Sequence, residues 1–226
     1  MSDLINSGPD NDSYSALIFA YASGCLNEAE SLIVSSHVAL SSRARNLLRS
    51  CEQMGGAILV EECQPVSMNE GALDSVLGRL GNVSDDSEEQ KGLSLTIPEM
   101  EFLPDILQTT LCQKVQQPRW KRIYSGFSSM EIVLDCTQSK ARLMKIDPAV
   151  KTPHHSHSSQ EITLVLDGAF EDEQGRYHVG DLVIREENSL HAPVACAQMG
   201  CVCMVVSSGP VKMTGWARLF NPFLRM

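Results

Sequence analysis

Five of the six histidines in this 226-residue chain lie between His154 and His191, and the sixth is His37. The first three of the five stand just before a short apolar and β-branched run, Thr163 to Leu166, which stops at Asp167-Gly168. Such a run with a turn pair behind it predicts a strand that ends at the turn. The clustering indicates that the imidazoles share one site beside this strand.

Two imidazoles and a carboxylate have the spacing that one face of a strand provides. His155, His157 and Glu161 share a parity, so they point to one side if the segment is extended throughout. His154 then faces the other way. Imidazole and carboxylate suit zinc, iron, manganese, nickel or copper, and His191 is the candidate for the remaining ligand. A His-x-His pair alone is more often part of an ordinary polar loop, so the choice between a loop and a metal site depends on the residues around it.

That pattern resembles the two motifs of the cupin family. The first motif reads His-x-His, three residues, Glu, six residues, Gly, and Gly180-Asp181 and a further histidine follow later. Residue by residue, the resemblance implies a metal held by His155, His157, Glu161 and His191. It implies one divalent transition metal, with zinc as the first choice and iron, manganese or nickel as alternatives.

Two positions depart from the cupin motifs. Asp147-Pro148-Ala149 stands where a glycine is usual upstream of the first motif, and Ala195 stands where an asparagine is usual after the second. Neither position is a ligand, so the predicted metal site is unaffected.

The first third of the chain has helical periodicity. Apolar residues at three and four spacing predict a helix over residues 11–24 and a longer one over 27–54 that ends at Gly55-Gly56. Ser67 to Glu70 has the form of a capping box, which predicts a third helix up to Gly81. Residues 82–92 are acidic and have no apolar face, as is typical of a linker.

The rest of the chain changes to short strand-like runs. A helix over 104–113 leads into this part, and turn residues then separate the runs, as in an antiparallel sandwich or barrel. The predicted strands are 121–124, 130–134, 141–146, 162–166, 169–171, 181–184 and 202–206. The fold class is therefore α+β, a small all-α domain followed by an antiparallel β-barrel.

Charge and cysteine usage narrow the functional classes. The formal net charge is −10, which disfavours direct binding to nucleic acid, because that needs clustered Lys and Arg. The eight cysteines form no Cys-x-x-Cys pair, and the N-terminus lacks the basic and apolar regions of a signal peptide. We therefore expect reduced thiols and a cytoplasmic protein. No apolar run approaches the roughly 20 residues of a membrane span.

Taken whole, the chain resembles the ChrR-type anti-sigma factors of bacteria. The matching segments are Ala20 to Gly24, Glu28-Ala29, Ser31-Leu32, Ser36-His37, Met54 to Gly56, Glu161 to Phe170, Gly180-Asp181, His191 to Ala195 and Pro222-Phe223. The resemblance implies that a helical domain binds an extracytoplasmic-function (ECF) sigma factor and that an RmlC-like jelly-roll cupin binds metal and responds to oxidative stress. With the acidic stretch as the boundary, we expect a helical domain over 1–81, a linker over 82–100 and a cupin over 101–226. The resemblance implies pairing of two chains through the cupins.

The helical domain lacks most of the zinc ligands that are usual in this family. After His37, Ser41 and Ala44 stand where the two cysteines of a His-x-x-x-Cys-x-x-Cys run are expected, and Asp12 stands where an early histidine is expected. A single histidine without soft partners does not make a tetrahedral zinc site. We therefore predict no zinc in the helical domain.

Two other functions remain open. A site of three histidines and a glutamate also suits a metalloenzyme of the dioxygenase or isomerase kind, and a barrel suits a pocket that senses a small molecule without turnover. Against an enzyme, Tyr177 and His178 are expected to face solvent beside a turn. Cys201 and Cys203 share a strand face and are expected to be core residues.

Overall fold

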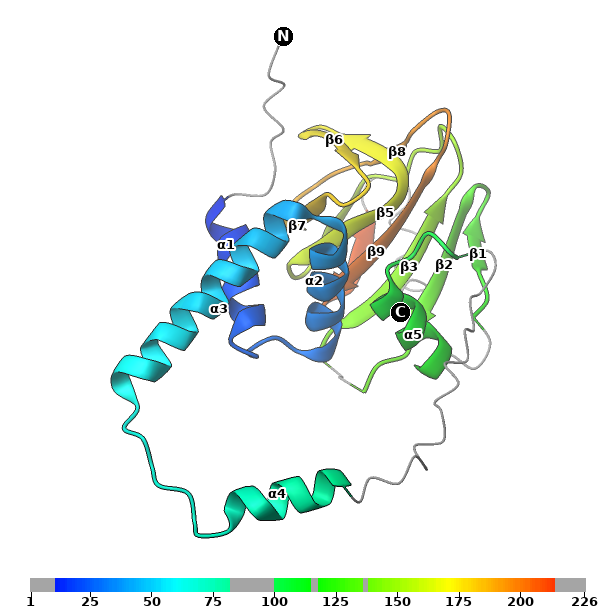
Figure 1. The fold of residues 1–226 in the computed structure, drawn as a ribbon. Helices are drawn as coiled ribbons and strands as arrows, with labels where there is room; N and C mark the ends of the chain where they lie inside the picture. The colour runs from blue at the N-terminus through cyan, green and yellow to red at the C-terminus, as the bar shows by residue number, and fades with distance from the viewer. Residues whose placement is uncertain (1–10, 82–99, 115–117, 136–137, 214–226) are drawn as a thin grey trace.

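The structure, a computed structural model, describes residues 11–81, 100–114, 118–135 and 138–213. Its helices are α1 (Asn11–Ala22), α2 (Glu28–Leu40), α3 (Ser42–Glu62), α4 (Ala72–Gly81) and α5 (Asp105–Lys114). Its strands are β1 (Lys121–Tyr124), β2 (Phe127–Ile132), β3 (Lys140–Ile146), β4 (His155–His157), β5 (Glu161–Asp172), β6 (Gly175–His178), β7 (Leu182–Arg185), β8 (Val194–Ala195), β9 (Cys201–Ser207) and β10 (Val211–Met213). The α+β class is thereby confirmed (Figure 1).

Two helices replace the single long one predicted over 27–54. Ser41 has an extended backbone, with φ −110° and ψ 119°, and its side chain caps α3 by accepting from the Ala44 amide at 3.3 Å. Helix α2 has its own capping box, since Asn27 accepts from the Glu30 amide while the Glu30 carboxylate accepts from the Asn27 amide. The local cap at Ser41 therefore overrides a continuous helical pattern.

The expected stop at Gly55-Gly56 is also wrong, because α3 continues to Glu62. A glycine weakens a helix by roughly 0.5–1 kcal/mol and does not forbid it, and neither glycine has a positive φ. The predicted capping box at Ser67 does not open a helix either. Helix α4 begins at Ala72, directly after Gly71 with φ 76°.

The strands form an antiparallel sheet in the order β1-β2-β3-β9-β5-β6, with β7 and β8 also paired to β5, and β10 paired to β4. Among the described residues this order does not close into a ring, so the region is a jelly roll with an open sheet. The turn predicted at Asp167-Gly168 is wrong, since β5 passes through both residues. The strand continues through these residues with a β-bulge between Val165 and Asp167 and a positive φ of 68° at Gly168.

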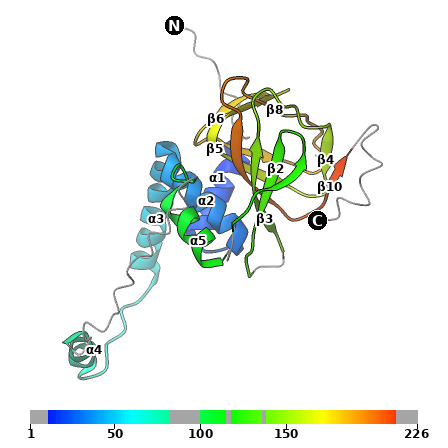
Figure 2. The same ribbon diagram turned by 90° about the vertical axis from the view of Figure 1, so that its right-hand side faces the viewer.

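The helices pack on the outer face of this sheet. One continuous hydrophobic cluster joins α1, α2, α3 and α5 to β2, β3, β5, β7 and β9, and it includes Ile33, Leu107 and Leu164. A second cluster, with Val165 and Val205, lies on the other face of the same strands. Figure 2 shows the helices on one side of the sheet and β4 and β10 on the other. The histidine-bearing strand is thus remote from the helices.

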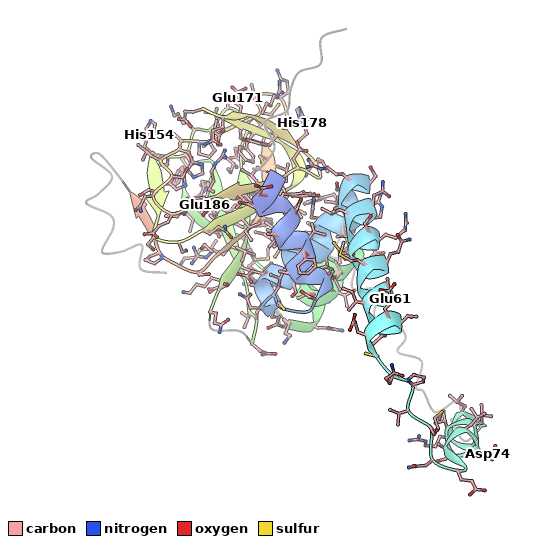
Figure 3. The ribbon with its side chains drawn as sticks, turned by 90° about the vertical axis from the view of Figure 1, so that its left-hand side faces the viewer. Glu61, Asp74, His154, Glu171, His178 and Glu186 are labelled. Atoms are coloured by element: carbon pink, nitrogen blue, oxygen red, sulfur yellow. The ribbon has the colours of Figure 1, made fainter. Side chains whose placement is uncertain are left out.

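One part of the helical region projects from this body. The second half of α3 and the whole of α4 extend away from the sheet in Figures 1 and 2. In Figure 3, Glu61 and Asp74 mark this projection, while Glu171 and Glu186 mark the strand region. The predicted boundary at residue 81 follows α4, and residues 82–99 of the predicted linker lie outside the described residues, as does Pro222-Phe223. No described helix has the length and apolar character needed to cross a membrane.

Candidate metal centre

Two short segments bring three of the predicted ligands together. His155 and His157 lie on β4, and an isolated antiparallel bridge joins His155 to His191, with both backbone hydrogen bonds at 3.2 Å. The ring centroids of His155 and His191 are 4.5 Å apart, and those of His157 and His191 are 5.4 Å apart. One ligand atom from each of the three lies within 4.8 Å of the others.

The hydrogen bonds indicate which ring nitrogens face this centre. His155 donates from Nδ1 to the Pro153 carbonyl at 2.8 Å, which leaves Nε2 with its lone pair. The Nε2 atoms of His157 and His191 lie 3.1 Å apart. Both these nitrogens therefore point into the same small space.

Glu161 stands beside the three imidazoles. Its Oε2 lies 3.2 Å from Nδ1 of His157, and its Oε1 lies 4.0 Å from Nε2 of His191. Thr163 donates to Oε1 at 3.5 Å. The carboxylate is thus next to the centre, although it is outside the group of three that lies within 4.8 Å.

Burial sets the charge state of these groups. Desolvation lowers the pKa of His155 to about 4 and that of His157 to about 3, and the neighbouring imidazoles add to the effect. Desolvation raises the pKa of Glu161 to about 7, against the opposing effect of His191. The two histidines are therefore neutral at pH 7, as a metal ligand must be.

The residues fit a divalent transition metal. The Nε2 atoms of His157 and His191 converge 3.1 Å apart, and Nε2 of His155 keeps its lone pair. Buried imidazole nitrogens that converge beside a carboxylate form an electron-rich space, which a bound cation stabilises. Three nitrogens and one carboxylate oxygen are the donor set of zinc, iron, manganese or nickel sites.

Two buried charged residues beside the three histidines escaped the sequence analysis. Asp172, at the end of β5, places Oδ2 3.7 Å from Nδ1 of His191, and it forms a buried ion pair with Arg185 of β7. Burial alone would raise the pKa of Asp172, but the contacts with His191 and Arg185 outweigh it and lower the pKa to about 2. Strict alternation from Glu161 would put Asp172 on the opposite face, so only the bulge in β5 reveals it.

The other residues singled out in the sequence lie outside the group of three histidines. His154 is exposed, at the periphery of the strand region in Figure 3, and His178 is exposed near Asp181. The expectation that Tyr177 faces solvent is wrong, because it is buried and its hydroxyl accepts from Arg185 at 3.1 Å. Cys201 and Cys203 are buried core residues, as predicted.

His37 occupies a different environment. Its Nε2 accepts from the hydroxyl of Tyr14 at 2.9 Å, and its Nδ1 donates to the carbonyl of Gly180 at 3.0 Å. Both ring nitrogens are therefore engaged. In the described part of the chain, His155, His157 and His191 form the one group of potential metal ligands found.

Comparison with known proteins identifies the family of the chain. Residues 108–212 match the family model described as the ChrR cupin-like domain. The anti-sigma-E factor ChrR of Cereibacter sphaeroides is 32% identical over 212 residues, which are 93% of this chain and 96% of the relative. The crystal structure of Rhodobacter sphaeroides SigE in complex with the anti-sigma ChrR matches with a TM-score of 0.68 and 31% identity, covering 85% of this chain and 96% of that one. The chain therefore belongs to the family of the anti-sigma factor ChrR.

Proposed function

We propose that this chain is an anti-sigma factor that binds an ECF sigma factor through its helices and carries a metal-binding, stress-sensing cupin. The proposal is supported by membership of the ChrR family and by the likeness to a ChrR chain that was solved with its sigma factor. A sigma factor acts on cytoplasmic RNA polymerase, so the proposed location is the cytoplasm.

The observation that carries the proposal is an apolar face on the projecting helices. On α4, Leu73, Val76, Leu77 and Leu80 recur at three and four spacing and are all exposed. On the second half of α3, Met54, Ile58 and Leu59 are more than half exposed. Stable monomers rarely expose such contiguous apolar surface, and an amphipathic helix of this kind is suited to a groove on a protein partner.

Charge favours the same kind of partner. The chain has a formal net charge of −10, whereas the surface with which a sigma factor contacts promoter DNA must be basic. An acidic protein that covers a basic surface needs no nucleic-acid contact of its own. We propose that this chain acts without touching DNA.

A co-purification experiment tests sigma binding. The full chain, expressed with a tagged ECF sigma factor from the same organism, should form a stable stoichiometric complex. The double variant Val76→Asp, Leu77→Asp should weaken this complex at least about tenfold, because it places charge in the apolar face. The control Leu190→Asp alters an equally exposed leucine outside the helices and should leave binding unchanged. Equal binding by all three proteins would contradict the assignment of α4.

For the cupin we propose a single divalent transition metal, zinc first, held by His155, His157 and His191 with Glu161 as the fourth ligand. The support is the convergence of three imidazoles and the adjacent carboxylate. When bound, such an ion provides a Lewis acid and a fixed positive charge. Burial keeps His155 and His157 neutral, and the hydrogen bond to the Pro153 carbonyl fixes the orientation of the His155 ring.

Strand β5 offers a route from this centre to the helices. Glu161 and Val165 lie on its inner face, whereas Ile162 and Leu164 of the same strand pack in the cluster that contains α1, α2 and α3. Loss of a ligand contact at Glu161 would move the strand that supports the helical domain. We therefore propose a sensor without catalytic turnover.

Pairing of two chains through their cupins remains a prediction of the family resemblance.

A further inference from the structure

The imidazole of His191 lies between two different sets of partners. Its Nε2 faces His157 at 3.1 Å and Glu161 at 4.0 Å, on the side of the proposed metal. Its Nδ1 faces the Oδ2 atom of Asp172 at 3.7 Å and is buried without a hydrogen-bond partner. We propose that Asp172 is a positioning residue, whose carboxylate accepts the Nδ1 proton of His191 and thereby keeps Nε2 as the metal-binding nitrogen. This inference rests on the metal site proposed above.

Asp172 is held in place for this role. Its side chain is 1% exposed, Oδ1 accepts from the amide of Gln174 at 2.9 Å, and Oδ2 accepts from Nη2 of Arg185. Arg185 is fixed in turn by hydrogen bonds to the Gln174 side chain and the Tyr177 hydroxyl. The carboxylate is therefore shielded from solvent, and its Oδ2 atom lies 3.7 Å from Nδ1 of His191.

The bulge in β5 makes this contact feasible. Val165 and Phe170 both belong to the inner hydrophobic cluster although they differ in parity, so the inner face switches from odd to even positions along the strand. Glu161 lies before the switch and Asp172 after it. One strand thus carries a proposed metal ligand and the carboxylate that orients another ligand.

A metal-bound histidine usually donates its second ring nitrogen to a carboxylate or carbonyl, which fixes the tautomer and the ring plane. His155 follows this rule through the Pro153 carbonyl at 2.8 Å. For His191 the carboxylate in this position is Asp172, 3.7 Å from Nδ1 and short of hydrogen-bond distance in this structure. The alternative is that Asp172 only neutralises Arg185, in which case the metal site would not depend on its charge.

Zinc affinity of the full chain, measured by competition with a chromophoric chelator, separates the two roles. Asp172→Asn should lower the affinity about 10- to 100-fold, the range expected for the loss of such a partner. Gln174→Ala is the matched control, since it removes a different side-chain contact of Arg185 and leaves Asp172, its backbone hydrogen bond and the Arg185–Tyr177 contact intact. Its affinity should stay within about twofold of the wild type.

The same substitution in two ligand-deficient backgrounds tests whether Asp172 acts through His191. In a His191→Ala background, Asp172→Asn should cause no further loss of zinc affinity. In a His155→Ala background, it should cause the full loss again. An equal loss in both backgrounds would show a merely structural role and overturn the inference.

A further variant distinguishes a loss of zinc affinity from a loss of folding. Asp172→Asn leaves the Arg185 guanidinium buried without its counter-charge, which destabilises a fold. The double variant Asp172→Asn, Arg185→Met removes both charges and should show the same loss of zinc affinity as the single variant. If Asp172→Asn or the double variant, folded by circular dichroism, binds zinc as the wild type does, the positioning role is wrong and the metal site stands. If the wild type itself binds no zinc, both fail.

Discussion

His37 in helix α2 donates a hydrogen bond from Nδ1 to the carbonyl oxygen of Gly180, 143 positions later, at 3.0 Å. Because Nδ1 is the donor, Nε2 is the acceptor for the Tyr14 hydroxyl. The neutral imidazole thus joins helix α1, helix α2 and the turn between β6 and β7. At the position where the family resemblance implies a zinc ligand, this chain has a contact between its helices and its cupin.

This contact predicts a pH dependence of stability. Burial lowers the pKa of His37 to about 4, against the opposing effects of the Gly180 carbonyl and Asp181. The unfolded chain therefore binds a proton at this residue before the folded one does, and stability is lost as the pH falls from about 6.5 towards 4. Between pH 7.5 and 4.5, the wild type should lose about 2 kcal/mol more than His37→Gln does in urea unfolding. Parallel losses in the two proteins would contradict this account.

Gly168→Ala should destabilise the cupin strongly. Gly168 has φ 68°, and a Cβ atom there would lie 2.2 Å from the carbonyl oxygen of Gly200. Strain at such a position costs roughly 1–3 kcal/mol, and the clash adds to it. Gly56→Ala is the control, because a Cβ there meets nothing within 4 Å in a helix interior. Thermal unfolding should show a lowered midpoint for the first variant and an unchanged or slightly raised one for the second.

Asn27 has two roles that substitution can separate. Its Oδ1 caps α2, and its Nδ2 donates to Ser139 beside β3 at 3.0 Å. Asn27→Ala removes both contacts and should lower the free energy of unfolding by about 1–2 kcal/mol. Asn27→Asp keeps the cap acceptor and loses the donor to Ser139, so its free energy of unfolding should lie between those of the wild type and Asn27→Ala. Chemical denaturation measures the series, and an Asp variant as unstable as the Ala variant would mean that the cap contributes little.

The grouping of His155, His157 and His191 and the fold class could be predicted because both depend on local patterns. His155, His157 and Glu161 are close in the sequence, so they stay close in space even where the segment is not one continuous strand. In the structure β4 ends at His157 and β5 begins at Glu161. The α-to-β change in periodicity along the chain is likewise a local signal.

The errors arise where one residue changes the backbone. Ser41 ends a helix whose apolar pattern continues, since a cap is decided by φ and ψ at a single position. The bulge after Val165 reverses the inward face of β5, which hid Asp172 from a period-two argument. Tyr177 is buried in the inner hydrophobic cluster, where Arg185 of the next strand donates to its hydroxyl, and a turn-based argument at Gly180-Asp181 gives no sign of that pair.

Metal content per chain tests most directly whether the cupin alone holds the metal. Elemental mass spectrometry on the purified full chain should give one equivalent of a divalent transition metal. His157→Ala removes one of the three converging imidazoles and should lose most of the metal, whereas His37→Gln should keep the full equivalent. Two equivalents in the wild type with one lost in His37→Gln, or full occupancy in His157→Ala, would contradict the account.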